Sequence, residues 1–117
     1  MDPRIVFRLR DISDAIEQID MLLATADFPR LQGDRVMRAA FERFLEIISE
    51  ASRHIPTELR EEAPDIPWRR IGDIGNHLRH AYNRVDAEIL WHIYADGELA
   101  SLAEAIRSFM EKIAREN

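Results

Sequence analysis

The chain has no cysteine among its 117 residues, so neither a disulfide framework nor a thiolate metal site is available to it. It also lacks any run that approaches the roughly 18 consecutive apolar residues of a membrane helix, and its first residues carry no basic stretch followed by an apolar one. No alternating strand pattern, internal repeat or low-complexity stretch is present. These absences favour a cytoplasmic protein with no membrane segment, in which residues 1–117 form one all-α domain.

The charge of the chain is acidic overall but uneven along its length. Its 16 basic and 22 acidic residues give a net charge of −6, which argues against a surface that holds nucleic acid by bulk electrostatics alone. Between residues 67 and 84, however, four arginines face one aspartate, so this segment carries +3 and the remainder carries −9. The segment therefore predicts a local site for an anionic ligand.

Apolar residues at helical spacing predict two long helices in the first half of the chain. The first covers 4–24, with Asp2 and Pro3 as its cap and first turn. Residues 27–33 contain a proline and a glycine and break the pattern. A second helix then runs to Pro56, and its apolar face consists of Val36, Ala40, Phe44, Ile47, Ala51 and Ile55, widened by Phe41, Leu45 and Ile48.

The second half of the chain predicts three further helices. Residues 57–63 form a short turn or helix, and a third helix follows from Pro67 to Tyr82. Asp86 caps a short fourth helix, and the turn at Asp96 and Gly97 precedes a fifth. Short connections favour an antiparallel helical bundle of four to five helices. The wide apolar faces fill the core of one chain or leave room for a homodimer, and the pattern alone does not choose between these two interpretations.

The third predicted helix carries an unusual polar face. Asp73, Asn76, His77, His80 and Arg84 lie at offsets of three, four, seven and eleven, so one helical stripe holds all five. Imidazole titrates near neutral pH and acts as a general base or acid, while a guanidinium stabilises a developing phosphorane charge. These are the groups that a metal-independent ribonuclease needs, with His80 activating a ribose 2′-hydroxyl and an arginine holding the phosphate.

Plainer interpretations of the same residues stand beside this one. Surface histidines are commonly solvated and inert. The spacing of His77 and His80 could bind a metal together with Asp73, but no further strong ligand or orienting outer shell is evident. We therefore expect no metal and no other cofactor. Tyr82 is either a core residue at a helix end or an exposed acceptor for a charged modification. The remaining candidates are expected to be packing or surface residues: Trp68, Trp91, His54 and His92.

Three motifs in order resemble the HepT-like branch of the HEPN helical proteins. They are the runs 66–71, reading IPWRRI, and 75–82, reading GNHLRHAY, followed by Val85-Asp86 and Ile89-Leu90-Trp91. The resemblance covers nearly the whole chain. It implies a HEPN-type antiparallel bundle that forms a homodimer, acts as an RNA-cleaving toxin and pairs with a minimal nucleotidyltransferase antitoxin. It also implies an active site built from the motif helices of both protomers.

The family motif reads Arg-Asn, three residues, His, one residue, Tyr. By this resemblance Asn76 and His80 are catalytic residues, and Tyr82 is the acceptor to which the nucleotidyltransferase transfers AMP, which silences the toxin. Gly75 stands where the family has arginine. Because glycine inside a helix costs about 1 kcal/mol relative to alanine, its presence predicts a close approach of another helix.

The missing arginine leaves two functional interpretations open. In the first, the cationic role passes to Arg79, with Arg70, Arg84 and His77 as further candidate phosphate contacts, and the chain is an endoribonuclease. In the second, Gly75 and the acidic net charge mark a catalytically silent HEPN scaffold that binds a nucleotidyltransferase partner.

Overall fold

The computed structural model describes residues 2–80 and 87–116, apart from the side chain of His80. Within these ranges the chain forms helices and no strand, and none of the helices is long and apolar enough to cross a membrane. The all-α prediction is therefore confirmed, with five helices of nine or more residues and two shorter ones. The helices are α1 (Arg4–Leu23), α2 (Phe28–Gly33), α3 (Arg35–Ser52), α4 (Thr57–Arg60), α5 (Trp68–His80), α6 (Ala87–Ala95) and α7 (Glu98–Glu116).

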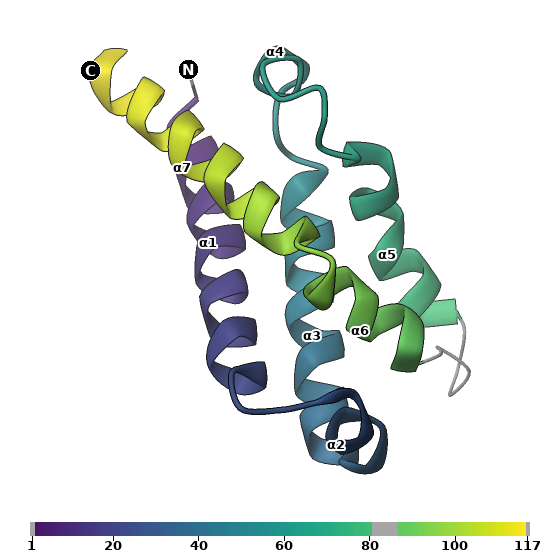
Figure 1. Ribbon diagram of the computed structural model, residues 1–117. Helices are drawn as coiled ribbons and strands as arrows, with labels where there is room; N and C mark the ends of the chain where they lie inside the picture. Colours follow the sequence, from purple (N-terminus) through teal and green to yellow (C-terminus); the bar gives the residue numbers. More distant parts are fainter. Residues whose placement is uncertain (1, 81–86, 117) are drawn as a thin grey trace.

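The long helices form an antiparallel bundle centred on α1 and α3 (Figure 1). Helix α7 packs on α1, and α5 packs on α3. The short α2 and α4 lie at opposite ends of the bundle, and α6 contacts both α2 and α7 (Figure 1). This arrangement leaves α5, the helix with the unusual polar face, at the side of the bundle rather than in its centre.

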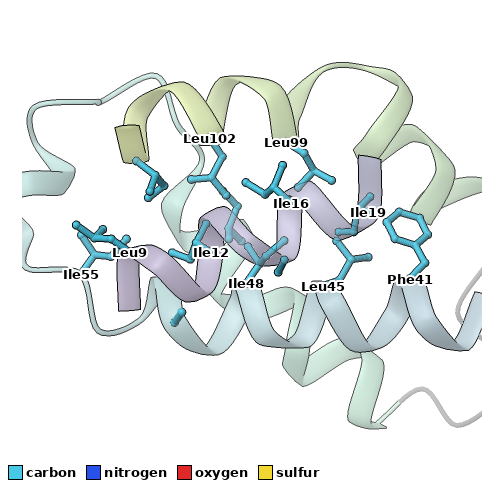
Figure 2. Packing of buried hydrophobic residues seen from close by; sticks show 14 of the residues in the cluster. Leu9, Ile12, Ile16, Ile19, Phe41, Leu45, Ile48, Ile55, Leu99 and Leu102 are labelled. Atoms are coloured by element: carbon cyan, nitrogen blue, oxygen red, sulfur yellow. The ribbon is translucent and has the colours of Figure 1, made fainter. Parts of the chain in front are cut away.

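The core lies where α1, α3 and α7 meet (Figure 2). The predicted stripe of α1 is confirmed, because its residues from Leu9 onward are buried at alternating spacings of three and four. Burial of apolar surface stabilises a fold by about 25 cal/mol per Å². The apolar contact between α1, α3 and α7 is therefore the main source of stability of the bundle. Its fully buried residues include Leu9, Ile12, Ile19, Phe41, Leu45, Ile48 and Leu102.

Two details of the first half differ from the sequence-based prediction. Along most of α3 the buried residues are Phe41, Leu45 and Ile48, which were predicted only to widen the face, and Val36, placed at the head of the main stripe, is 80% exposed. At the C-terminal end of that stripe, Ala51 and Ile55 are buried as predicted. Residues 27–33 do not simply interrupt the helices but form α2. Asp27 accepts a hydrogen bond from the Arg30 N–H at 2.9 Å, Pro29 lies in the first turn, and Leu31 is buried. A cap and one anchoring side chain are therefore enough to fold this short segment.

The first turn of α5 is fixed by its tryptophan. The Trp68 indole N–H donates to the carbonyl oxygens of Arg60 and Ala63, at 3.2 and 3.0 Å. Its ring also stacks on Phe109 of α7, with the ring centroids 6.0 Å apart. These contacts confirm Trp68 as a packing residue and tie the start of α5 to both α7 and the connection after α4.

The middle of α5 approaches α3 closely, through a set of three residues that we call the α3–α5 seam: Ser49, Gly72 and Gly75. The Ser49 hydroxyl donates to the Gly72 carbonyl oxygen at 2.8 Å and accepts from the Gly75 N–H at 2.9 Å. All three residues are buried, and the Ser49 side chain is completely so. The close helix approach predicted from Gly75 is thus confirmed.

The seam predicts opposite outcomes for two glycine substitutions on the same helix. A Cβ at Gly75 would lie 3.0 Å from Ser49 Oγ and 3.2 Å from Ser49 Cβ, both on a buried and hydrogen-bonded side chain. Overpacking of this kind costs about 1–3 kcal/mol, which exceeds the gain of about 1 kcal/mol from replacing a helical glycine. We expect Gly75→Ala to lower the free energy of unfolding, measured by urea denaturation.

Gly72→Ala is the matched control. A Cβ there would meet Arg53 Cγ at 3.3 Å, and Arg53 is an exposed, flexible side chain that can shift. We expect this variant to be as stable as the original chain or slightly more stable. A Gly75→Ala protein that resists urea as well as Gly72→Ala would show that the seam is not tight.

Candidate functional site

The polar stripe of α5 faces away from the bundle. Asp73, Asn76 and His77 are exposed, whereas Ile71 and Gly75 on the opposite side are buried against the neighbouring elements. Because α5 makes its main contact with α3 through this buried side, the polar side chains are free of the core. In the described part of the motif, the predicted separation of an apolar face from a polar one is confirmed.

The second half of the motif is only partly described. His80 is the last residue of α5, one turn beyond Asn76, and its side chain lies outside the description. Tyr82, Arg84 and the predicted cap Asp86 lie outside the described residues. The roles expected for these four residues therefore stay predictions.

Arg79 folds back over Gly75. The guanidinium nitrogen Nη1 lies 3.4 Å from the point where a Cβ of residue 75 would be. Side chains of an α-helix lean toward its N-terminus, so a residue reaches over the one four positions earlier. Because Gly75 has no side chain, it leaves room for the guanidinium. The helix thus holds a cation beside residue 75, although that residue itself carries none.

The arginines near the motif differ in whether a carboxylate already engages them. Arg70 forms an ion pair with Glu98 of α7, and Arg53 is paired with Glu50. Hydrogen bonds from His54 and Arg53 lower the pKa of Glu50, so this carboxylate stays charged beside Arg53. For Arg79 no carboxylate partner is found among residues 2–80 and 87–116. Arg79 is therefore better suited than Arg70 to receive a phosphate.

The two histidines outside the motif each contact a carboxylate four residues away, at the C-terminal end of α3 and of α6. His54 Nε2 lies 3.2 Å from Glu50, and His92 Nδ1 lies 3.3 Å from Asp96. Both are exposed, as expected for surface residues. No group of three histidine, aspartate or glutamate side chains in the described ranges is arranged to hold a metal ion.

Ser49 is the residue near the site that the sequence pattern did not single out. It lies on α3, outside the motif helix, and a serine within an amphipathic helix is ordinarily of little significance. The one available signal was its position directly after the apolar Ile47 and Ile48, which predicts burial of a hydroxyl that then needs partners. Those partners are backbone groups of α5.

Comparison with known proteins identifies relatives over most of the chain. A protein of Thermococcus cleftensis described as "Probable ribonuclease HepT" is 40% identical over 83 residues, which are 71% of this chain and 76% of that protein. A "Putative RNase" of Methanocaldococcus jannaschii is 34% identical over 85 residues, covering 73% of this chain and 78% of that protein. No solved structure matches the chain.

The family comparison agrees with these relatives and with the motif resemblance. The model of the family described as "Ribonuclease HepT-like" matches residues 12–113, from within α1 to within α7. The match therefore spans the bundle core, the α3–α5 seam and the polar stripe together. The chain belongs to the ribonuclease HepT-like family.

Proposed function

We propose that the chain is a metal-independent endoribonuclease and the toxin of a toxin–antitoxin pair, acting on RNA in the cytoplasm. The observation that carries the proposal is the Arg79 guanidinium beside Gly75, with no carboxylate partner among the described residues. It lies next to Asn76 and His77, which are exposed on the same helix. The family match and the two relatives named as ribonucleases support the same activity.

The proposed reaction is transesterification within the RNA. His80 removes the proton from a ribose 2′-hydroxyl, and the 2′-oxygen attacks the adjacent phosphorus. The bond from phosphorus to the 5′-oxygen then breaks, and that oxygen takes a proton from the histidinium or from water. The products are a 2′,3′-cyclic phosphate and a 5′-hydroxyl, so no metal-bound nucleophile is required.

Arg79 and Asn76 supply the positioning and the charge stabilisation in this scheme. The pentacoordinate phosphorane carries more negative charge than the phosphodiester, and a fixed guanidinium stabilises that additional charge. Asn76 lies one turn before His80 and offers an amide for orienting the histidine or the phosphate. His77, Arg70 and Arg84 are further candidate phosphate contacts, of which Arg70 must first leave Glu98.

We expect His80→Ala and Arg79→Ala each to reduce RNA cleavage about 100-fold or more, because each removes one group that acts in the transition state. Cleavage of total RNA by the purified protein, in the presence of a metal chelator, is the measurement. Arg69→Ala is the matched control. Arg69 is an exposed arginine of the same helix, about 15 Å from Arg79 along the helix axis, and its loss should change cleavage little.

The alternative is a catalytically silent scaffold that binds the nucleotidyltransferase. It gains support from the seam, because the buried contact between Gly75 and Ser49 leaves no room for the family's arginine at this position. On induced expression, equal growth and equal RNA integrity for the original chain and His80→Ala would favour the scaffold and contradict the nuclease.

The proposed antitoxin is a minimal nucleotidyltransferase that transfers AMP to Tyr82. A nucleotide attached two residues after His80 would block RNA sterically and repel its backbone by like charge. We expect incubation with ATP and a minimal nucleotidyltransferase of this kind to add one AMP-sized increment to the intact mass. Tyr82→Phe should abolish the increment, whereas Tyr94→Phe, which removes a half-buried tyrosine packed on Trp91, should keep it. An unchanged increment in Tyr82→Phe would reject this acceptor.

The proposed active unit is a homodimer whose site combines the motif helices of two protomers. The family resemblance implies this assembly, and the described residues include four large apolar side chains that are exposed, namely Phe7, Met21, Val36 and Ile89. Light scattering after gel filtration should give twice the 13.7 kDa of one chain. Specific activity should fall on dilution, since a composite site dissociates. A monomeric mass together with dilution-independent cleavage would contradict the shared site.

A further inference from the structure

Ser49 is the one serine of α3 whose hydroxyl contacts the motif helix in the described residues. Its side chain is fully buried, and both of its hydrogen bonds reach α5 backbone atoms, the Gly72 carbonyl oxygen and the Gly75 N–H. A buried hydroxyl that bonds to the backbone of another helix fixes the distance and the rotation between the two helices. Ser49 therefore determines how closely this stretch of α5 lies to α3.

The same hydroxyl borders the space that Arg79 occupies. The Cβ position of Gly75 is 3.0 Å from Ser49 Oγ and 3.4 Å from Arg79 Nη1. Ser49 thus limits the space beside Gly75 from the α3 side, and the Arg79 guanidinium lies next to that space. A change in the separation of the two helices would alter the surface against which Arg79 rests.

We propose that Ser49 is a positioning residue for Arg79, which it holds beside Gly75 by fixing α5 against α3. This inference rests on the proposed nuclease function and names the part of the structure that replaces the missing motif arginine. A long arginine side chain on a helix surface has many rotamers, and a phosphate site requires one of them. The seam limits the rotamers of Arg79, because it places α3 and the Gly75 backbone next to the guanidinium.

Ser52 provides a matched comparison within the same helix. It is buried like Ser49, but its hydroxyl donates to the Ser49 carbonyl oxygen, at 2.7 Å, inside α3 itself. Replacing either serine by alanine removes a buried hydroxyl from α3. The two substitutions differ in that Ser49→Ala also removes the hydrogen bonds to α5.

The experiment compares Ser49→Ala, Ser52→Ala, Arg79→Ala and the double variant Ser49→Ala/Arg79→Ala on a short mixed-sequence RNA labelled with a fluorophore and a quencher. A misplacement near 1 Å can cost about 100-fold in rate, and we expect Ser49→Ala to lower kcat by about tenfold with little change in KM. Ser52→Ala should keep kcat within about twofold. Ser49→Ala should cause no further loss when Arg79 is already alanine.

Three results would overturn the inference. They are a Ser49→Ala kcat equal to that of the original chain, equal losses in Ser49→Ala and Ser52→Ala, and a full additional loss in the Arg79→Ala background. If Ser49→Ala does not fold, Ser49→Cys replaces it, since this variant keeps a γ atom in the seam, although a larger one, and weakens the hydrogen bonds. An intermediate loss of kcat is expected from it, and an unchanged kcat would overturn the inference as well.

A second readout separates this inference from the proposed function. The Nε–H signal of the Arg79 guanidinium in a ¹⁵N NMR spectrum reports its surroundings whether or not the protein cleaves RNA. We expect this signal to shift in Ser49→Ala and to stay in place in Ser52→Ala. If the original chain does not cleave RNA, the nuclease proposal fails. The signal then still decides whether Ser49 positions Arg79, and an identical signal in both serine variants rejects it.

Discussion

The contact of one serine hydroxyl with the backbone of a neighbouring helix determines how α5 lies on α3. Ser49 bridges Gly72 and Gly75, and these glycines allow α5 to lie directly on α3. A larger residue at Gly75 would push the two helices apart at the point where the polar stripe begins. Gly75 is buried in the helix interface, and a side chain at this position would begin in contact with Ser49.

In the proposed nuclease, the charge of the motif comes from elsewhere on the helix. Helical geometry makes residue 79 the natural donor, since its side chain leans back by one turn. Two arginines near the motif are engaged by carboxylates, Arg70 by Glu98 and Arg53 by Glu50. An acidic chain with a net charge of −6 thus keeps a cation unpaired, among the described residues, at the motif end of α5. Whether an arginine is paired therefore depends on the carboxylates near it and not on the total charge of the chain.

The sequence predicted the parts of the fold that depend on periodicity. The stripe of α1, the packing role of Trp68 and the close approach at Gly75 all followed from spacing or from the cost of glycine in a helix. The short α2 was missed because six residues are too few to show a helical period, although the Asp27 cap was readable. In α3 two apolar stripes lie side by side, and which residues are buried depends on how α1 and α5 pack against this helix.

The candidate site was less accessible to sequence reasoning than the fold. The exposed positions of Asn76 and His77 could be predicted, because they lie opposite an apolar stripe on their own helix. The contact of Ser49 with α5 could not be predicted, because its partners lie 23 and 26 positions further along the chain. Likewise the freedom of Arg79 and the engagement of Arg70 depend on which carboxylates other helices bring close.

Helix α5 is anchored at its first turn, so a small tilt there is amplified at its far end. Its first turn is pinned where Trp68 stacks on Phe109 and bonds to two carbonyl oxygens, and the seam supports it near the middle. From Trp68 to His80 the axis is about 18 Å long, so a tilt of about three degrees at the pivot moves the far end by about 1 Å. A substitution at Phe109 that tilts α5 would therefore displace Asn76 and Arg79 while leaving the sequence of the motif unchanged.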